Sequence, residues 1–285
     1  MQMKLRIAIV GPGRLGSALT LELARAGYPI SEIVIRGNQR PAKNLARRVH
    51  ARLATISHAR LDAEVIWFCV PDHEIAGAAR ALERSTDWRQ KIAFHSSGAL
   101  ASDELDRLRQ RGASVASVHP LMTFVSKSAP KLKGVPFALE GDSKAKRLAE
   151  TVVRDLGGEA LSLTKHSKAA YHAWGTFVSP LLIATLVTAE RVAGLAGISA
   201  TEARRQMMPI VRQTIENYRK LGPAEAFSGP LVRGDIATIR EHLRVLRKIP
   251  AVRDVYLTLA RLALRHLPVK NRQALQRILS SGATS

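Results

Sequence analysis

The N-terminal half of the chain alternates short apolar runs with segments in which apolar residues recur at helical spacing. The apolar runs predict seven strands, at residues 4–10, 32–36, 64–70, 91–95, 114–118, 134–140 and 159–163. The helical segments lie between them, at residues 14–27, 42–50, 101–111 and 143–156 and from about residue 72. The third strand, at residues 64–70, is almost wholly apolar, as expected of a parallel strand buried on both faces. Strands that alternate with helices in this way indicate an α/β fold with a doubly wound, mostly parallel sheet.

The pattern changes after about Lys165, where the strand-like runs stop and helical periodicity continues along the rest of the chain. Glycine and proline residues interrupt that periodicity and predict about five helices. The interruptions lie at Gly197, Gly222, Pro230 and Pro250. We therefore expect two domains, an α/β domain at residues 1–165 and an all-α domain at residues 166–285.

Residues 173–189 carry no charge. A bilayer span needs roughly 17–25 mostly apolar residues, so this stretch is at the lower limit of that length. It also contains a glycine, a proline and several hydroxyl residues, and we interpret it as a helix buried between its neighbours, with no membrane partner. The N-terminus shows no export signal, and Cys69 is the one cysteine, so no disulfide can form within the chain. Both observations favour a cytoplasmic protein.

A glycine-rich loop follows the first predicted strand and opens the first predicted helix, the context that dinucleotide binding requires. The loop consists of Gly11, Pro12, Gly13, Arg14, Leu15 and Gly16, in the pattern G-x-G-x-x-G. The first glycine permits the tight turn, the second lets the backbone approach a pyrophosphate, and the third lets the helix pack against the strand. The free N–H groups and the dipole of the helix N-terminus favour the phosphate charge. The first domain is therefore expected to be a Rossmann domain that binds a nicotinamide dinucleotide.

The end of the second predicted strand indicates which dinucleotide is bound. Sites that prefer NAD usually place an Asp or Glu there, bonded to the ribose hydroxyls. This chain has Arg36 instead, followed by Asn38 and Arg40. A guanidinium forms charge-assisted, bidentate bonds to a 2′-phosphate, which an acidic side chain would repel. We predict NADP as the cofactor; the alternative is that Arg36 is one more arginine of a basic chain.

Val70 and Pro71 end the most apolar strand, at the carboxyl edge of the sheet where ligands of such folds bind. We expect their backbone to line the region of the nicotinamide ribose. Cys69 precedes them and is interpreted as a small buried core residue rather than as a redox group.

Several motifs together resemble a known family. They are the glycine loop, Cys-Val-Pro-Asp at 69–72, His-Ser-Ser-Gly at 95–98, His-Pro-Leu-Met-Thr-Phe at 119–124, Tyr-His-Ala at 171–173, and Gly-Pro-Leu-Val-Arg-Gly-Asp at 229–235 with His-Leu at 242–243. Their order and spacing are similar to those of bacterial Rossmann-like proteins with a C-terminal domain of unknown function 2520. That family resembles pyrroline-5-carboxylate and ketopantoate reductases and the wider 6-phosphogluconate dehydrogenase-like group. The resemblance implies NADP binding, a helical C-terminal domain for substrate, and homodimerisation through those helices.

Hydride transfer needs one protein group that exchanges a proton with the substrate heteroatom. His119 follows a predicted strand, and a similar His-Pro step acts on the substrate hydroxyl in prephenate dehydrogenases; the alternative is a structural histidine at a strand end. Lys168 and His172 are four residues apart and share one helix face. Related hydroxyacid and ketopantoate reductases have a Lys and an Asn at this separation, so His172 replaces the Asn here. Lys165 could also fill the lysine position, and a surface lysine is the alternative for Lys168.

Two segments are candidates for holding the substrate. His95, Ser96 and Ser97 follow a predicted strand and offer hydroxyls and backbone amides to a carboxylate or phosphate; the alternative is an ordinary turn with a capping serine. Arg233 and Asp235 follow a Gly-Pro turn. The arginine could hold an anionic substrate from across a dimer, or the pair could cap and bridge helices.

The formal charge of +21, from 44 Lys and Arg against 23 Asp and Glu, raises the question of nucleic-acid binding. The basic residues are scattered, however, and aromatic residues are only 5% of the chain, too few for an obvious base-stacking platform. We expect a basic surface that attracts anionic metabolites, without specific nucleic-acid binding. The nine histidines are dispersed and there is no second cysteine, so we expect no metal site.

The sequence thus favours an NADP-dependent oxidoreductase acting on a small anionic carbonyl, imine or hydroxy compound. In this hypothesis Ser96 and Ser97 hold the substrate, and His119 or Lys168 moves the proton. The alternative is an NADP(H)-binding sensor or regulatory protein without turnover, because no single residue is unambiguously catalytic.

Overall fold

The computed structural model describes residues 4–37, 40–125 and 130–281. It divides into two compact units, Met1–Ser179 and Pro180–Ser285. Helix α6 (Lys168–Val178) follows the boundary expected near residue 165, and in the structure it lies with the sheet in the first unit. Lys168 and Tyr171, three residues apart on one face of α6, are its buried residues.

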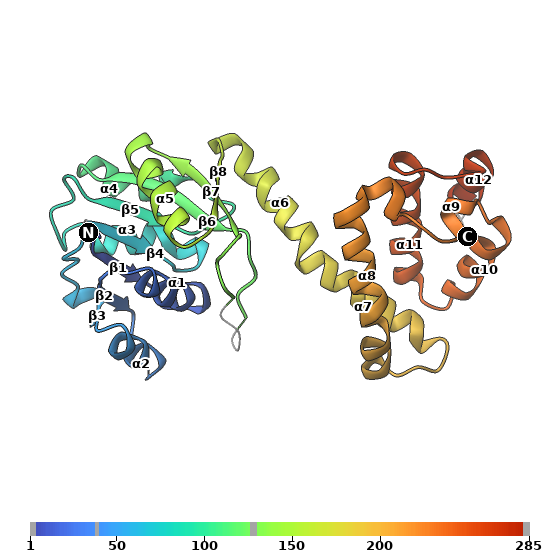
Figure 1. Cartoon of the computed structure of the whole chain (residues 1–285), viewed down its shortest axis with the longest axis horizontal. Coiled ribbons are helices and arrows are strands. Elements are labelled where there is room, and N and C mark those ends of the chain that lie inside the picture. The colour runs from blue at the N-terminus through green and yellow to red at the C-terminus, as the bar shows by residue number, and fades with distance from the viewer. Residues whose placement is uncertain (1–3, 38–39, 126–129, 282–285) are drawn as a thin grey trace. The chain divides into compact units, whose positions relative to one another are not determined.

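An eight-stranded sheet forms the centre of the first unit (Figure 1). The strands are β1 (Ile7–Val10), β2 (Ile30–Ile35), β3 (Arg52–Thr55), β4 (Val65–Phe68), β5 (Ile92–His95), β6 (Ser114–Pro120), β7 (Pro136–Gly141) and β8 (Glu159–Ser162). They lie in the order β3-β2-β1-β4-β5-β6-β7-β8, and every neighbouring pair is parallel except β6 and β7. The predicted α/β class with a mostly parallel sheet is confirmed. The prediction missed β3, a four-residue strand at the edge of the sheet with little buried surface.

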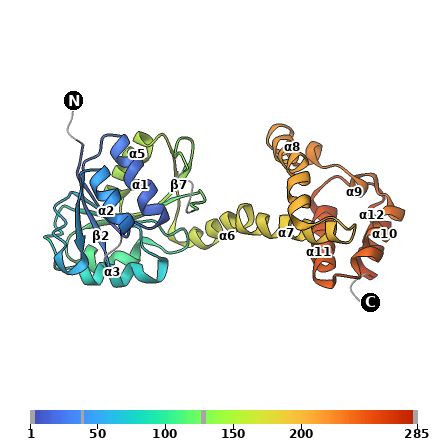
Figure 2. The same cartoon turned by 90° about the horizontal axis from the view of Figure 1, so that it is seen from below.

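Helices cover both faces of this sheet. They are α1 (Arg14–Arg25), α2 (Arg40–Arg48), α3 (Ile75–Leu82), α4 (Asp106–Gln110) and α5 (Ser143–Asp155). Figure 2 shows α1 and α5 on one face and α3 on the other. Successive side chains of a strand point to opposite faces, so Ile7 and Ile9 of β1 pack in the core beside α1 and α5. Ala8 and Val10 of the same strand belong to the core beside α3 and α4.

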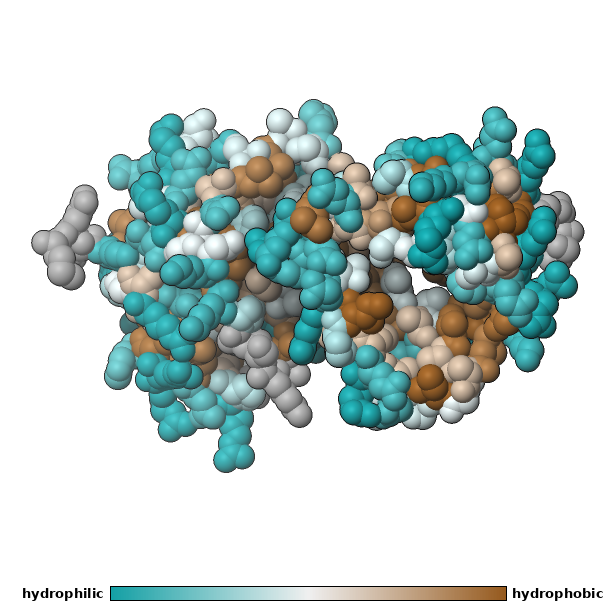
Figure 3. Space-filling model, turned by 45° about the vertical axis from the view of Figure 1, so that its right-hand side comes forward, coloured by the Kyte–Doolittle hydropathy of each residue, from teal (hydrophilic) through white to brown (hydrophobic). Residues whose placement is uncertain are grey.

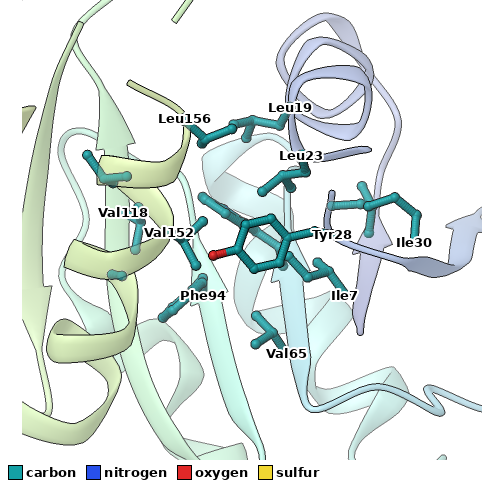
Figure 4. Close-up of a cluster of buried hydrophobic side chains, with 14 of the residues drawn as sticks. Ile7, Leu19, Leu23, Tyr28, Ile30, Val65, Phe94, Val118, Val152 and Leu156 are labelled. Atoms are coloured by element: carbon teal, nitrogen blue, oxygen red, sulfur yellow. The ribbon is translucent and has the colours of Figure 1, made fainter. Parts of the chain in front are cut away.

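Tyr28 lies at the centre of the core beneath α1 and α5 (Figure 4). Leu19, Leu23 and Phe94 surround its ring. Its hydroxyl donates to Asp155 Oδ2 over 2.7 Å, so the ring is buried while its polar end has a partner. Each large apolar side chain buried in this way stabilises the fold by roughly 1.5–3 kcal/mol. The sheet is therefore a firm platform for the loops at its edge.

The chain leaves β1 toward β2 on one side, and β4 lies on the other side of β1. This reversal of strand order creates a crevice at the carboxyl ends of β1 and β4, which is where open α/β sheets bind ligands. The glycine loop follows β1, and Val70 and Pro71 follow β4. Both predicted cofactor motifs therefore lie at the crevice.

The second unit is helical throughout its described residues, as the change of periodicity predicts. Its helices are α7 (Pro180–Gly194), α8 (Ala200–Ala226), α9 (Pro230–Arg233), α10 (Ile236–Leu246), α11 (Pro250–His266) and α12 (Arg272–Ser281). Helices α10, α11 and α12 share an apolar core that includes Ile239, Leu257 and Leu275. Helix α8 is interrupted at Gly222, whose φ of 77° is left-handed.

Among the described residues, one helical stretch, Lys165–Gly194, is long and apolar enough to cross a membrane by length and composition, with a mean hydropathy of 1.4. The sequence predicts that it is buried between neighbours, but only 6% of its apolar window is buried within the chain. Trp174, Phe177 and Ile183 are 49%, 69% and 59% exposed. Figure 3 shows apolar patches among the hydrophilic side chains of the helical region. Within the described residues, the chain itself therefore buries little of this stretch, contrary to the prediction.

Candidate active site

The three glycines of the loop after β1 differ in the space around them. Gly11 has a left-handed φ of +89°, and a Cβ there would lie 2.6 Å from Cγ1 of Val70. A Cβ on Gly16 would lie 2.3 Å from the carbonyl oxygen of Gly11 and 2.9 Å from Cβ of Cys69. A Cβ on Gly13 would meet nothing within 4 Å, so its backbone faces open space. This arrangement fits a pyrophosphate that approaches Gly13 while the other two glycines hold the turn and the helix in place.

A pocket of about 350 Å³ lies beside the loop. Its lining includes Pro12, Gly13, Arg36, Val70, Pro71 and Glu74. Of the other predicted loop residues, Arg14 is exposed in the first turn of α1, and Leu15 packs against the core beneath that helix. The lining is therefore made by the ends of β1, β2 and β4, as the cofactor prediction requires.

Arg36 lies at the rim of this pocket and is 66% exposed at its side chain. Its Nη1 donates to Oε1 of Glu74 over 2.8 Å. Arg40 begins α2 and lines a different surface cavity, together with Lys43 and Arg47. Asn38 lies outside the described residues. The guanidinium of Arg36 thus lies at the rim of the pocket, where it was predicted to bind a 2′-phosphate. In the structure it is paired with Glu74, which the sequence analysis did not select.

Cys69 lines the same pocket, and its Cβ is the atom that a side chain on Gly16 would meet. Burial raises the pKa of its thiol to about 12, and a hydrogen bond with Ser96 opposes that rise only in part. The thiol is therefore protonated at neutral pH and is a poor nucleophile.

A second group of polar side chains gathers at the carboxyl ends of β5 and β6, where α6 crosses them. Lys168 is only 1% exposed, and its Nζ donates to the carbonyl oxygen of Ser97 over 3.0 Å and to Oγ of Ser117 over 2.6 Å. Burial lowers the pKa of Lys168 to about 8, while the charges of Glu140 and Asp72 act in the opposite direction. The lysine is mainly charged at neutral pH but close to its titration.

Lys165, the other lysine considered from the sequence, is exposed and forms an ion pair with Asp103. Its ammonium group is thus bound at the surface. Of the two lysines, the structure brings Lys168 into the buried group at the ends of β5 and β6.

His119 joins the same group from β6. Its Nδ1 is 2.9 Å from the hydroxyl of Tyr171, and the two rings meet edge to face. Burial lowers the pKa of His119 to about 4, assisted by the charges of Lys168 and His172. Burial also raises the pKa of Tyr171 to about 12, so imidazole and phenol are both neutral at neutral pH. The sequence analysis names Tyr171 within a family motif but gives it no role in the site, although its position three residues after Lys168 places it on the same helix face.

His119 and His172 converge over Gly98, in the loop after β5. A Cβ on Gly98 would lie 2.9 Å from Nε2 of His119 and 2.9 Å from Cδ2 of His172. His172 is otherwise exposed. The absence of a side chain at Gly98 therefore leaves the room in which the two imidazoles lie. His119 thus lies close to His172, which was predicted to share a helix face with Lys168.

The predicted substrate residues of the loop after β5 are engaged within the protein. Both ring nitrogens of His95 have partners, Nε2 with the carbonyl oxygen of Ala101 at 2.9 Å and Nδ1 with the N–H of Ser97 at 3.1 Å. Ser96 accepts from Nε1 of Trp67 over 2.8 Å. The hydroxyl of Ser97 donates to Oδ2 of Asp72 over 2.8 Å. These side chains hold the loop to β4 and to the cofactor edge.

Arg233 lies in the second unit, where it is exposed at the end of α9. The following Gly234 has a φ of +64°, and a Cβ there would lie 2.5 Å from the carbonyl oxygen of Lys270. Asp235 caps α10 by accepting from the N–H and the hydroxyl of Thr238, at 3.1 and 2.7 Å. The Gly-Asp part of this motif is therefore explained by local structure, which leaves Arg233 as the member with an unassigned role.

In the part of the chain that the structure describes, no group of three or more His, Cys, Asp or Glu side chains could hold a metal ion.

Two domain models match the sequence. The Rossmann-like domain model matches residues 1–120, and the model of the domain of unknown function 2520 (DUF2520) matches residues 135–263. The first match defines the class of the N-terminal half, and the pair confirms the resemblance drawn from the motifs. The chain is a Rossmann-like protein with a DUF2520 domain. No curated protein matches the chain.

Solved structures share the fold across both units. A protein from Bacteroides fragilis assigned as an NADP oxidoreductase is 20% identical, with a TM-score of 0.75, over 91% of this chain and 97% of that one. Protein TM1727 of Thermotoga maritima is 25% identical, with a TM-score of 0.73, over 90% and 96% of the two chains. A reductive aminase from Aspergillus terreus, in complex with NADPH and ethyl-5-oxohexanoate, is 18% identical, with a TM-score of 0.65, over 96% and 99%.

Proposed function

We propose that the protein is an NADP-dependent oxidoreductase that acts on a small, anionic carbonyl or imine compound or on the corresponding hydroxy compound. One observation carries this proposal: within a single compact unit, one edge of the sheet holds both the glycine cradle and a buried group of Lys168, His119 and Tyr171. The fold shared with an assigned NADP oxidoreductase and with a reductive aminase that binds NADPH supports it.

The cradle residues fit the proposed cofactor. In this proposal the backbone of Gly11 to Gly16 and the N-terminus of α1 bind the pyrophosphate, with Arg14 adding positive charge at its edge. Arg36 binds the 2′-phosphate, while Val70 and Pro71 line the nicotinamide ribose. When bound, the nicotinamide exchanges a hydride with the substrate carbon.

Lys168 is the better candidate for moving the proton. With a pKa of about 8 it is charged at neutral pH, whereas His119, with a pKa of about 4, is neutral. A protonated ammonium can donate to a carbonyl oxygen or imine nitrogen in reduction and accept a proton back in oxidation. His119 and His172 then orient the substrate by hydrogen bonding. His95, Ser96 and Ser97 shape the floor of the site.

We also propose that the protein is a homodimer and that a second copy covers the exposed apolar side chains of α6, such as Phe177, and of α7, such as Ile183. Exposed apolar side chains that gather on one helix face often mark an interface with another protein. Light scattering after gel filtration should give twice the chain mass. The double variant Phe177→Glu with Ile183→Glu should give the monomer mass, whereas a requirement for detergent would favour a membrane instead.

A thermal-shift titration with NADPH, NADP, NADH and NAD in parallel tests the cofactor. A ligand that binds the folded state raises Tm by an amount that grows with its concentration over Kd, so stabilisation by the phosphorylated pair is expected. NADPH oxidation would then be followed with a panel of keto acids and imines. If none of the four ligands shifts Tm, the cradle does not bind a nicotinamide and the enzyme proposal fails with it.

The alternative function is an NADP(H)-binding sensor without turnover. The observation that favours it is the burial of the candidate acid, since Lys168 and Tyr171 are 1% and 6% exposed. A tight NADPH complex that no compound of the panel oxidises, at any pH between 6 and 9, would decide for this alternative.

A further inference from the structure

The ammonium group of Lys168 donates hydrogen bonds to two oxygen atoms, and these two atoms are also joined by a hydrogen bond. Nζ donates to Oγ of Ser117 over 2.6 Å and to the carbonyl oxygen of Ser97 over 3.0 Å. The hydroxyl of Ser117 in turn donates to the same carbonyl oxygen over 3.0 Å. Lys168 is 1% exposed and Ser117 is 0% exposed, so water does not compete for these bonds.

This geometry fixes the direction of every bond in the triangle. A hydroxyl has a single proton, and Ser117 gives it to the carbonyl oxygen of Ser97, so the lone pairs of its Oγ are available to Lys168. Ser117 lies in β6 between β5 and β7, and its side chain therefore has a rigid base. The loop that carries the Ser97 carbonyl is fixed as well, because the hydroxyl of Ser97 accepts from the N–H groups of Ala99 and Leu100.

We propose that Ser117 is a positioning residue for Lys168, whose hydroxyl holds the ammonium group in one place at the carboxyl ends of β5 and β6. The sequence analysis did not select Ser117, because a serine within an apolar strand has no motif around it. The catalytic consequence rests on the proposed function, whereas the positioning itself can be measured on the protein without ligands.

The charges around Lys168 agree with this role. Glu140 from β7 and Asp72 after β4 favour the charged form, and burial opposes it. His95 and His119 also face the lysine, and each has a pKa lowered to about 4, so neither is charged at neutral pH. Oγ of Ser117 is the closer of the two hydrogen-bond acceptors of Nζ. It favours the charged form of Lys168 because it accepts from the ammonium group.

The same bonds connect Lys168 to the cofactor edge of the sheet. Ser97 accepts from Lys168 through its carbonyl oxygen and donates to Asp72 through its hydroxyl. Asp72 directly follows Pro71, which lines the pocket beside the glycine loop. A cofactor that displaces Asp72 is therefore expected to change the environment of Lys168 through Ser97.

The experiment is an NMR titration of the full chain labelled with 13C at Cε of lysine, without cofactor or substrate. The Lys168 signal is assigned by its loss in Lys168→Met, and its midpoint is expected near pH 8. Removing a buried acceptor of the charged group should lower the midpoint by about one pH unit in Ser117→Ala. Ser117→Cys, of nearly the same size with a weaker acceptor, should lower it in the same direction and serves if the alanine variant does not fold.

The matched control is Ser96→Ala, which removes a buried hydroxyl from the same loop that bonds to Trp67 and not to Lys168. Its midpoint should equal that of the wild type. The proposal is overturned if the Ser117 variants leave the midpoint unchanged, or if the control shifts it equally. NADPH added to the same samples tests the proposed function separately, because a failure to bind is seen in the cofactor titration and leaves the Ser117 result standing.

Discussion

The cradle after β1 and the buried group after β5 and β6 lie on one edge of one sheet, yet they are built in opposite ways. The cradle is made of backbone, with open space beside Gly13 and with Arg36 exposed at its rim. The second group is made of side chains whose polar atoms already have partners within the protein. The difference indicates that the first region is shaped to receive a ligand, whereas the second is shaped to hold charge and proton positions fixed.

Lys168→Met should have the largest effect, because it removes the candidate acid without changing the size of the side chain much. Loss of a general acid costs typically 10²–10⁴-fold in turnover. Wild-type reduction should also fall as the pH rises above about 8, since the lysine then loses the proton that it donates. Steady-state rates between pH 6 and 10 check both expectations, and a full rate in the variant would remove Lys168 from the mechanism.

The same variant should be more stable than the wild type at neutral pH. The pKa of Lys168 is about 8 in the folded chain against an ordinary 10.5, so the unfolded state binds more protons between these values. Stability of the wild type therefore rises with pH from about 8 to 10.5, and below that range the buried charge costs its full amount. We expect Lys168→Met to raise the unfolding free energy at pH 7 by ~1 kcal/mol, which corresponds to a rise in Tm of about 2–4 °C. The rise should be smaller at pH 10. A lower Tm at pH 7 would contradict this.

Gly13→Val separates ligand binding from folding in the cradle. The φ of Gly13 is −68°, and a Cβ there meets nothing within 4 Å. The unfolding free energy of the ligand-free variant should therefore lie within about 0.5 kcal/mol of the wild-type value. NADPH affinity should fall by about 100-fold, because the side chain fills the space that the pyrophosphate needs. Calorimetry measures the affinity. Gly16→Val is the contrasting variant, expected to lose stability because its Cβ meets the Gly11 carbonyl.

Arg36→Ala should weaken NADPH binding by about 10–100-fold, the value of a charge-assisted hydrogen bond to phosphate, and leave NADH binding nearly unchanged. Equal losses for both cofactors would show that Arg36 does not contact the 2′-phosphate. Glu74→Gln is the matched variant, since it frees Arg36 from its ion pair while keeping the guanidinium. It should improve NADPH binding by a few-fold.

Tyr171→Phe should have the smallest effect. It removes the hydroxyl bonded to Nδ1 of His119 and keeps the buried ring, so we expect a loss of about 0.5–1.5 kcal/mol in unfolding free energy. Denaturant titration measures the loss. A change in NADPH affinity of more than about twofold in this variant would contradict the view that the buried group and the cofactor region act separately.

Much of the sheet and the position of the cradle could be predicted from the sequence, because buried parallel strands are short apolar runs and the glycine loop has a fixed relation to strand and helix. Strand β3 could not, since an exposed edge strand such as Arg52–Thr55 has no apolar run. Burial of the stretch around Phe177 was predicted from composition, which does not say whether the covering surface belongs to the same chain.

The buried group was predicted in outline only. His119 and Lys168 were found because each follows a recognisable position, a strand end or a helix face. Ser117 and Glu74 were not, because their importance depends on which atom each side chain reaches across the sheet, and a single sequence contains no measure of that. The hydrogen bond of Ser96 with Trp67 could not be predicted either, because the two residues are 29 positions apart in the sequence.

Cys69 has a consequence for how the cradle can be observed. Its thiol is protonated, it is partly exposed in the lining of the pocket beside the loop, and it is the one cysteine in the chain. A thiol reagent reaches it through the pocket in which the dinucleotide is proposed to bind, so the labelling rate reports whether that pocket is occupied. A bound dinucleotide should slow the labelling, which makes the native residue a reporter of occupancy that requires no turnover and no knowledge of the substrate.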